Sequence, residues 1–306
     1  GADAVKVQTY TADTITIDSD KKYFRINQKT IWDGQTLHQL YQKAYTPWDW
    51  QPKLQKIAED LGLIFFSSPF DKSAVDFLEK MKIPAYKIAS FEITDVGLIE
   101  YVSKKNKPII ISTGIATLQD IREAIKTVRK AGNEKIALLK CTSAYPAGLD
   151  QMNLKTIGDM KAKFRTVVGL SDHSLESSVD VAAVSVGAKI IEKHFILDRK
   201  LGGADAPFSL EPDEFALMVK EIRKAETALG KVTYDLSDKQ KKSREHSRSL
   251  FVVEDIKKGE TFTDKNVRSI RPGFGLHPRH LAKILGKKAC QDISRGTPFK
   301  LEHIAK

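Results

Sequence analysis

The sequence predicts an α/β protein whose main part is a barrel of parallel strands covered by helices, followed by a small β-rich domain. The first observation is a regular alternation of short apolar segments with amphipathic helical segments. The second is that polar side chains follow the apolar segments, at the strand ends where such barrels build their active sites. The third is a change of composition after residue 233, where helical patterning gives way to short strands flanked by turns.

Composition places the chain among globular proteins large enough for one big domain and a small one. It has 306 residues, of which 41% are hydrophobic and 29% charged. No apolar run has membrane-spanning length and no signal-peptide pattern opens the chain, so we expect no membrane partner. Only two cysteines occur, Cys141 and Cys290, which favours a reducing, cytoplasmic location. Because no histidine is near Cys141 in sequence, we expect it to be a packing residue.

The net charge of +11 raises the question of nucleic-acid binding. Most basic residues are spread over predicted helix faces, with one local cluster at residues 239–248. No aromatic residues interleave with that cluster, as a platform for single strands would require. Solvated helix faces and an anionic small substrate explain the charge more simply, so no nucleic-acid partner is expected.

The predicted elements begin with a strand at residues 1–9 and a long connection at 10–46 that contains a helix around 37–43. A helix from 46 to about 60 follows, with Pro47 in its first turn. Further strands are expected at 63–67, 85–88, 108–112, 136–141, 166–170 and 188–191, and further helices at 72–81, 96–104, 118–131, 154–163, 175–186 with Ser174 as N-cap, and 211–229. This gives seven parallel strands, whereas eight close a (β/α)₈ barrel.

Two neighbouring strand ends carry the most informative residues. The segments 169–173 and 190–195 are apolar runs that each end in a histidine next to a carboxylate. A strand–helix–strand unit makes two parallel neighbours, so His173 and His194 are predicted to converge. Two neutral imidazoles can share a divalent metal and leave its other positions open for water or substrate. Each histidine could equally be an ordinary packing or hydrogen-bonding residue.

The other strand ends form a predicted ring of lysines, hydroxyls and carboxylates. Such a ring suits a phosphate or carboxylate anion, although any single lysine could belong to a structural ion pair. Its members are Lys6, Gln8, Ser67, Ser68, Lys87, Ser90, Glu92, Ser112, Thr113, Ser143, Tyr145, Ser171, Asp172, Glu192 and Lys193. In the loop at 202–207, Asp205 could bind sugar hydroxyls or be an ordinary turn residue.

After a polar, basic linker at 234–247, residues 248–306 are predicted to form the small β-rich domain. Within it, the segments 255–262 and 292–299 are weakly similar, and each is typical of a turn into a short strand. A domain of about sixty residues is marginal alone and is expected to dock on another surface. The predicted domains are therefore 1–233 and 248–306, joined by the linker.

Several motifs, in this order along the chain, resemble the sialic acid synthase family. They are Lys-Val-Gln-Thr at 6–9, Ser-Ser-Pro-Phe at 67–70, Ala-Tyr-Lys-Ile-Ala-Ser-Phe-Glu at 85–92, Ser-Thr-Gly at 112–114, Gly-Leu-Ser-Asp-His at 169–173 and Ile-Glu-Lys-His-Phe at 191–195. The segment around Arg-Pro-Gly at 271–273 resembles that family's antifreeze-like (SAF, β-clip) domain. Within the family, residues 32–37, 45–50 and 89–92 resemble the pseudaminic acid branch.

The resemblance implies a transferase that condenses phosphoenolpyruvate with an open-chain amino sugar, giving a nine-carbon 2-keto acid and phosphate. For the pseudaminic acid branch the sugar is 2,4-diacetamido-2,4,6-trideoxy-L-altrose. An N-acetylneuraminic or legionaminic acid synthase with the same mechanism is the alternative. A further alternative is a non-catalytic barrel that only binds sugars or partner proteins.

The resemblance also implies roles for particular residues. A divalent metal, manganese or else magnesium or cobalt, would bind His173 and His194. Glu192 matches a residue around the sugar, and either it or a carboxylate that this sequence lacks could manage the water proton. Phosphoenolpyruvate contacts are implied for Lys6, Lys87, Ser90, Ser112, Ser143 and Ser171. Sugar contacts are implied for Gln8, Tyr145, Asp205 and Arg271, the last reaching into the partner's barrel of a domain-swapped homodimer.

Two departures from the family pattern are visible. The family begins with one more βα unit, which carries a proposed acid/base glutamate in an Ala-Glu-Ile-x-x-Asn-His-like motif. That motif does not occur here, so we expect a barrel that lacks its first βα unit. In addition, Lys140 and Ser143 stand where some sialic acid synthases carry histidine and asparagine, which argues against N-acetylmannosamine as the substrate.

Overall fold

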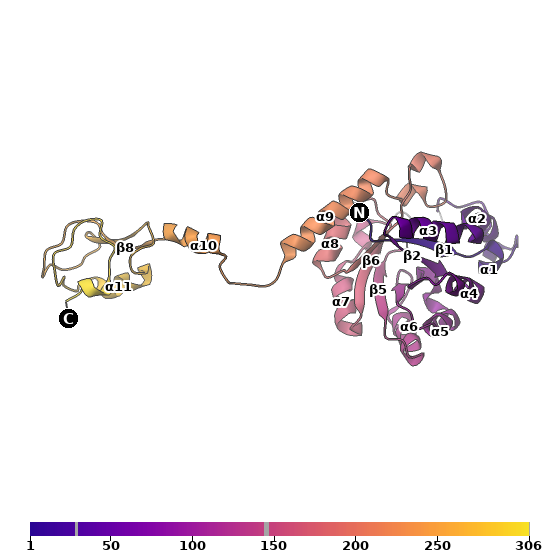
Figure 1. Cartoon of the computed structure of the whole chain (residues 1–306), viewed down its shortest axis with the longest axis horizontal. Coiled ribbons are helices and arrows are strands. Elements are labelled where there is room, and N and C mark those ends of the chain that lie inside the picture. The colour runs from indigo at the N-terminus through magenta and orange to yellow at the C-terminus, as the bar shows by residue number, and fades with distance from the viewer. Residues whose placement is uncertain (28–29, 144–146, 306) are drawn as a thin grey trace. The chain divides into compact units, whose positions relative to one another are not determined.

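The computed structural model divides the chain into two compact units, Gly1–Gly230 and Lys231–Lys306 (Figure 1). It describes residues 1–27, 30–143 and 147–305. Each unit contains a cluster of buried apolar side chains of its own. No helix in the described part of the chain is long and apolar enough to span a membrane.

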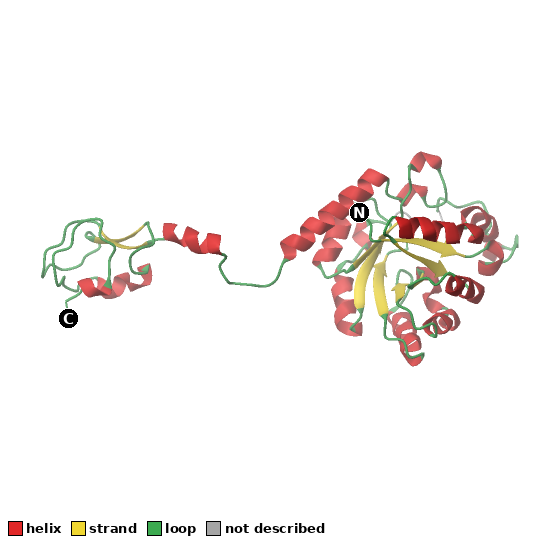
Figure 2. Ribbon diagram, viewed as in Figure 1, coloured by secondary structure: helices red, strands yellow, loops and turns green. Residues whose placement is uncertain are grey.

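The centre of the first unit is one curled sheet of seven parallel strands (Figure 2). Each strand pairs with the next one in the chain, in the order β1 (Ala4–Thr9), β2 (Ile64–Pro69), β3 (Tyr86–Ile88), β4 (Ile109–Ser112), β5 (Ile136–Cys141), β6 (Val167–Asp172) and β7 (Ile190–Lys193). Strands β1 and β7 are the two edges of this sheet. The predicted fold class, an open parallel barrel followed by a small domain, is confirmed.

Helices connect the strands and cover the outer face of the sheet (Figure 2). Helix α6 shows why they pack there: Ile121, Ala124, Ile125 and Val128 are buried, a spacing that forms one apolar stripe. The helices are α3 (Gln51–Asp60), α4 (Lys72–Lys80), α5 (Val96–Ser103), α6 (Leu118–Lys130), α7 (Lys155–Phe164), α8 (Ser177–Ser185) and α9 (Pro212–Leu229). The buried stripes of α3 to α8 and the outward-facing strand residues form the main core, while Met218 and Ile222 of α9 belong to a separate apolar cluster.

The β1–α3 connection contains two further helices, α1 (Ala12–Ile15) and α2 (Leu37–Ala44), and the second of these confirms the helix expected around 37–43. The helix expected from residue 46 begins instead at Gln51, with Pro52 in its first turn, because Trp48–Trp50 form a separate 3₁₀ turn. Likewise α8 begins at Ser177 rather than 175. The N-cap position is Glu176 and not Ser174, whose hydroxyl accepts from the N–H of Glu176, ahead of the helix, and donates to the Asp172 carboxylate.

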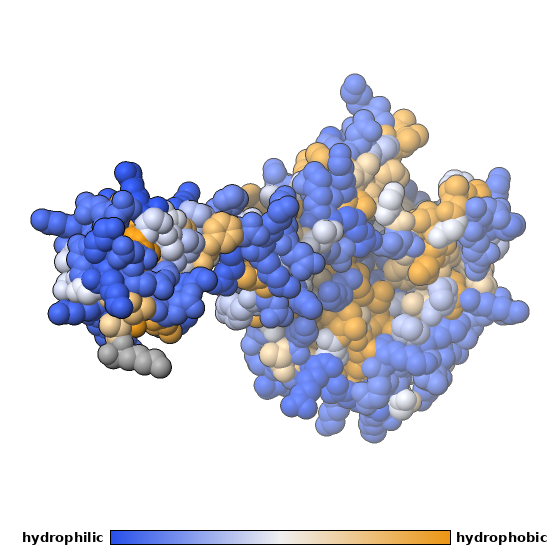
Figure 3. Space-filling model, turned by 60° about the vertical axis from the view of Figure 1, so that its left-hand side comes forward, coloured by the Kyte–Doolittle hydropathy of each residue, from blue (hydrophilic) through white to orange (hydrophobic). Residues whose placement is uncertain are grey.

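Edge strands leave apolar side chains exposed on the first unit. Val5 on β1 is 37% exposed, and Phe195, directly after β7, is 57% exposed. In the view of Figure 3, apolar groups gather on part of this unit while hydrophilic side chains cover most of the remaining surface. The two edge strands are therefore less covered than β2 to β6, most of whose residues are buried.

The second unit contains an antiparallel pair, β8 (Ser249–Val252) and β9 (Val267–Ile270), with the short helices α10 (Asp238–Ser243) and α11 (Leu281–Ile284). The similar segments 255–262 and 292–299 face each other through a single bridge, where Ile256 and Ile293 exchange backbone hydrogen bonds of 2.9 and 2.8 Å. The short strands predicted there are thus reduced to isolated bridges among the described residues, while their apolar residues fill the core of this unit.

Candidate active site

The two predicted histidines lie next to each other. His173 directly follows β6 and His194 directly follows β7, and these strands are parallel neighbours. The centroids of the two imidazole rings are 5.2 Å apart. The expected convergence of the two rings is confirmed, whereas their role as metal ligands stays a prediction.

Each imidazole is oriented by an oxygen behind it. The Nδ1 atom of His173 lies 3.2 Å from the carbonyl oxygen of Thr142, which can only accept, so Nδ1 carries the hydrogen. Burial, and next the neighbouring His194, lower the pKa of His173 to about 4, so its ring is neutral at pH 7. The Nδ1 atom of His194 lies 3.2 Å from the Asp205 carboxylate. Burial opposes ionisation of Asp205, but its hydrogen bond to His194 prevails and lowers its pKa.

A neutral imidazole held by a carbonyl or a carboxylate is the form in which histidine binds metals. The donor chemistry of this pair therefore fits a divalent ion. Within the described residues, no group of three or more His, Cys, Asp or Glu side chains could hold a metal. An ion bound here would accordingly take its other ligands from water or substrate, which leaves it open for chemistry.

Inside the sheet, two lysines face one carboxylate. The ammonium groups of Lys6 and Lys87 lie 3.5 and 3.7 Å from the two carboxylate oxygens of Glu192. Burial disfavours the charged form of Glu192, but the two lysines outweigh it and hold its pKa at about 2. Burial lowers the pKa of Lys87. The cluster has more positive than negative groups, so it is suited to an added anion.

Hydroxyl groups surround this cluster. Lys87 donates a hydrogen bond of 2.7 Å to Ser112, and the hydroxyl of Ser171 is 3.5 Å from Glu192. Ser90 and Ser143 share a hydrogen bond of 2.9 Å. A Cβ atom on Gly114 would lie 2.1 Å from the Ser143 hydroxyl, so only glycine fits at that position. The structure thus brings the predicted phosphoenolpyruvate residues into two adjacent groups, at the ends of β1, β3, β4, β5 and β6.

The predicted sugar contacts are less closely grouped. Asp205 contacts His194, and Gln8 lies on β1 opposite Ser68 of β2. Tyr145 lies outside the described residues. Arg271 belongs to the second unit, where it directly follows β9 and is exposed.

Several members of the predicted ring do not face the site. Asp172 and Lys193 alternate with the histidines, lie on the outer face of the sheet and pair with each other at 2.5 Å. Ser67 bonds to Thr9, and its hydroxyl also donates to a strand carbonyl. Thr113 likewise donates to the carbonyl of Leu139. Their assignment to the site is wrong, because their polar groups are used within the sheet and its packing.

Cys141 lies closer to a histidine than its sequence position indicates. Its sulfur is 4.0 Å from Nδ1 of His173, because Cys141 ends β5, the strand beside β6. Burial raises the pKa of its thiol, so the reactive thiolate is disfavoured at neutral pH. The expected packing role remains the better interpretation.

Two further residues lie at the site: Glu92, which was predicted only as a member of the ring, and Phe208, which was not predicted. Glu92 is a half-buried residue near Lys87, and its buried Oε2 has no hydrogen-bond partner among the described residues. Burial raises its pKa to about 7, which suits a proton donor or acceptor. Phe208 packs edge-on against both rings, with centroids 6.0 Å from His173 and 5.0 Å from His194. No local pattern marks Phe208, because its contacts depend entirely on how the 202–208 loop folds back.

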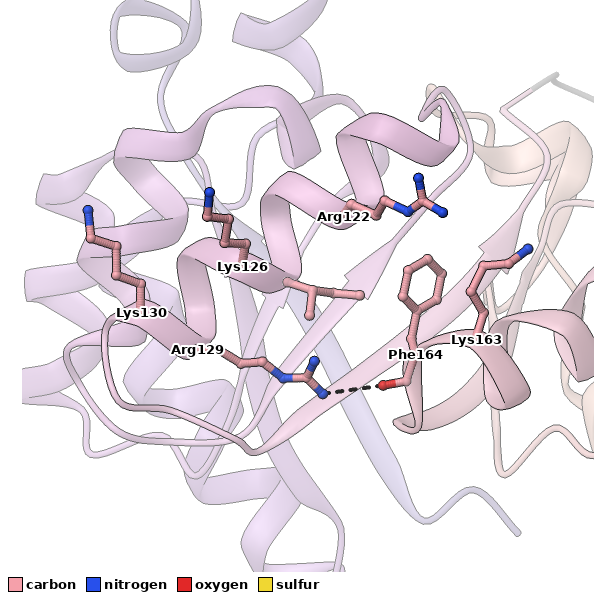
Figure 4. Close-up of a pocket in the computed structure, with 7 residues that line it drawn as sticks. Arg122, Lys126, Arg129, Lys130, Lys163 and Phe164 are labelled. Atoms are coloured by element: carbon pink, nitrogen blue, oxygen red, sulfur yellow. Dashed lines mark hydrogen bonds between the residues drawn. The ribbon is translucent and has the colours of Figure 1, made fainter.

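A separate basic groove lies on the outer surface between α6 and α7 (Figure 4). Arg129 of α6 donates to the carbonyl oxygen of Phe164 in the last turn of α7, at 3.2 Å. Helix C-termini favour such cations, because their last carbonyls lack partners within the helix. The lining contains none of the predicted site residues; it consists of Arg122, Ile125, Lys126, Arg129, Lys130, Lys163 and Phe164.

Residues 1–234 match the model of the NeuB family, and residues 247–305 match that of the SAF domain. The chain belongs to the NeuB family, and the resemblance found in the sequence is confirmed.

Relatives within this family are similar over nearly the whole chain. The pseudaminic acid synthase of Campylobacter jejuni subsp. jejuni (strain 81-176) is 46% identical, covering 98% of this chain and 87% of that protein. The N,N'-diacetyllegionaminic acid synthase of Legionella pneumophila is 36% identical, covering 99% and 86%. Among solved structures, the N-acetylneuraminic acid synthetase of Leptospira borgpetersenii in complex with citrate matches with a TM-score of 0.70 and 28% identity, covering 79% of each chain.

Proposed function

We propose that this chain is a pseudaminic acid synthase, which condenses phosphoenolpyruvate with 2,4-diacetamido-2,4,6-trideoxy-L-altrose and releases phosphate. The observation that carries the proposal is its 46% identity to a pseudaminic acid synthase, against 36% to a legionaminic acid synthase of similar coverage. The site supports the chemistry, because a cluster with surplus positive charge lies beside a pair of imidazoles, of which that of His173 is neutral at pH 7.

In this proposal Lys6 and Lys87 bind the phosphate and carboxylate of phosphoenolpyruvate. Their present partner Glu192 is a single carboxylate, so an anion entering the cluster meets ammonium groups already held in place. Four hydroxyls complete the anion site by donating to its oxygens, namely those of Ser90, Ser112, Ser143 and Ser171. The main gain is orientation, because a fixed enol carbon approaches the sugar aldehyde in one geometry.

A divalent metal, manganese or else magnesium or cobalt, would be held by His173 and His194. When bound, it supplies Lewis-acid polarisation of the sugar aldehyde. Thr142 and Asp205 fix the tautomers and orientations of the two rings from behind. Phe208 packs against both rings and limits their rotation.

The bond changes then follow from the substrates. The enol carbon attacks the aldehyde carbon, whose oxygen takes up a proton, and positive charge develops at C2. Water adds at C2 and loses its protons as the C–O bond to phosphate breaks, which leaves the 2-keto group and free phosphate. The Glu192 carboxylate, ionised because its pKa is about 2, stabilises that positive charge. It becomes a better proton acceptor once phosphoenolpyruvate neutralises the two lysines. Glu92, with a pKa of about 7, can exchange a proton at neutral pH.

On the sugar side, Gln8 and Asp205 would bind hydroxyl or acetamido groups from the first unit. Tyr145 and Arg271 are proposed as further sugar contacts, with Arg271 supplied by the second copy in a domain-swapped homodimer. A cytoplasmic location, where phosphoenolpyruvate is available, belongs to the same proposal.

The test is phosphate release from phosphoenolpyruvate with Mn²⁺ and each of three sugars: the altrose derivative, N-acetylmannosamine and the legionaminic acid precursor. We expect kcat/KM to be at least about tenfold higher for the altrose derivative, with mass spectrometry detecting the nine-carbon product. A preference for another sugar would assign the chain to that branch of the family. Sugar binding by calorimetry without phosphate release would favour the non-catalytic barrel.

A further inference from the structure

We propose that Lys193 and Asp172 are positioning residues, which hold the two histidine-bearing strand ends together from the outer face of the sheet. The inference rests on the proposed function in one respect, namely that His173 and His194 bind the metal. Its physical basis is a buried network of an ion pair and hydrogen bonds. This network connects Asp172 and Ser174, on either side of His173, to Lys193, which precedes His194.

The first link joins the two strands directly. Asp172 precedes His173, Lys193 precedes His194, and the two residues face each other in the register of β6 and β7. Their side chains point to the outer face and form an ion pair of 2.5 Å, with 0% and 1% of the side chains exposed. This pair is also the last one in the β6–β7 ladder. The histidines follow where strand pairing has ended, so the ion pair is the connection nearest to them.

The second link continues past His173. The ammonium group of Lys193 donates to the carbonyl oxygen of Ser174 at 2.6 Å. Ser174 donates to the Asp172 carboxylate twice, from its N–H and its hydroxyl, each at 2.9 Å. Residues on both sides of His173 are therefore bonded to each other and to Lys193. This arrangement fixes the backbone from which both imidazoles extend.

The third member of the network provides a contrast. Asp180 belongs to α8, and its Oδ2 lies 3.5 Å from the ammonium group of Lys193. It is buried, and neither of its carboxylate oxygens has a hydrogen-bond partner among the described residues. Asp180 thus connects the network to a helix and not to either histidine. If the network only stabilised the fold, replacing Asp180 and replacing Asp172 would have similar effects on the two imidazoles.

The experiment compares Lys193→Met and Asp172→Asn with Asp180→Asn as the matched control in the full chain. The first readout is Mn²⁺ affinity, from the electron paramagnetic resonance signal of the free ion. Loss of groups that orient metal-binding histidines typically weakens affinity by about 10- to 100-fold, and we expect that loss for Lys193→Met and Asp172→Asn. Asp180→Asn is expected to bind Mn²⁺ as the parent does.

The second readout is independent of metal and of catalysis. Histidine side-chain NMR spectra of the metal-free protein report the environment of each ring. We expect the signals of His173 and His194 to shift in Lys193→Met and Asp172→Asn and to keep their parent positions in Asp180→Asn. Circular dichroism checks that each variant is folded, and Asp172→Asn alone decides the matter should Lys193→Met fail to fold.

The outcomes separate the two proposals. Parent-like Mn²⁺ affinity and unmoved ring signals in the folded variants would overturn the positioning role, as would equal changes in Asp180→Asn. A parent protein that binds no Mn²⁺ would instead overturn the proposed metal role of the histidines. The NMR comparison would in that case still decide whether Lys193 and Asp172 hold the rings in place.

Discussion

The two faces of β6 and β7 carry charged clusters of opposite composition. On the inner face, Lys6 and Lys87 face a single carboxylate, Glu192. On the outer face, one ammonium group, that of Lys193, lies between the carboxylates of Asp172 and Asp180. The inner cluster has spare positive charge for a ligand, whereas the outer one is enclosed by helix α8. Consecutive residues of β7, Glu192 and Lys193, therefore belong to a candidate anion site on one face of the sheet and to a structural ion-pair network on the other.

The largest expected effect is on the inner face. His173→Ala and His194→Ala should each abolish Mn²⁺-dependent phosphate release, a fall of about 10³-fold or more, because a metal would lose one of its two protein ligands. His246→Ala, at an exposed position in the second unit, is the control. Unchanged activity in both variants would reject the metal assignment.

The next effect concerns stability and belongs to the outer face. Lys193→Met leaves two buried carboxylates without their cation, which should lower the free energy of unfolding by about 3–5 kcal/mol. Lys87→Met should cost much less, because Lys87 is a desolvated cation beside a second cation. Urea denaturation of both variants measures the difference. Equal losses in the free energy of unfolding would contradict the proposed difference between an outer cluster that needs its cation and an inner cluster with a surplus of cations.

A smaller effect concerns ligand binding. Lys87→Met should raise the KM for phosphoenolpyruvate by roughly 10- to 150-fold, since a hydrogen bond to a charged group contributes about 1.5–3 kcal/mol. Lys126→Met, in the groove between α6 and α7, is a matched control that should leave KM unchanged. A parent-like KM in Lys87→Met would show that the inner cluster is not the anion site.

The smallest effect is a pH dependence at Glu92. Burial raises the pKa of this carboxyl from 4.5 to about 7, so the folded state retains a proton that the unfolded state releases between these values. The stability contributed by that proton is present below pH 4.5 and lost as pH rises through 7. The stability of Glu92→Gln relative to the parent should therefore be roughly 2–3 kcal/mol higher at pH 8 than at pH 5. A pH-independent difference in urea denaturation would contradict the buried, protonated Glu92.

Much of the architecture could be predicted because it depends on local patterns. The alternation of strands and helices, together with the rule that successive strands are parallel neighbours, placed His173 beside His194. The position of Asp172 and Lys193 on the outer face of the sheet could also have been predicted from the sequence. Side chains along a strand alternate between its two faces for as long as the strand is paired, and the pairing of β6 with β7 extends to Asp172 and Lys193.

Other features depend on contacts between distant segments. The approach of Cys141 to His173 comes from the packing of β5 against β6, across 32 residues of sequence. The pKa of Glu92 depends on burial that no local pattern reveals, and Phe208 reaches both imidazoles through a loop. The start of α3 was missed because Pro47 and Pro52 are both compatible with a first helical turn, and tertiary packing decides between them.

One hydrogen bond in the loop that carries Asp205 has an experimental use. The indole N–H of Trp32 donates to the carbonyl oxygen of Ala204, at 3.0 Å, and Ala204 precedes Asp205. The Trp32 ring also packs edge-on against Phe208, with centroids 6.5 Å apart. Its emission is consequently a built-in optical signal of the loop that orients His194, and a Trp32→Phe variant isolates that signal from the other two tryptophans.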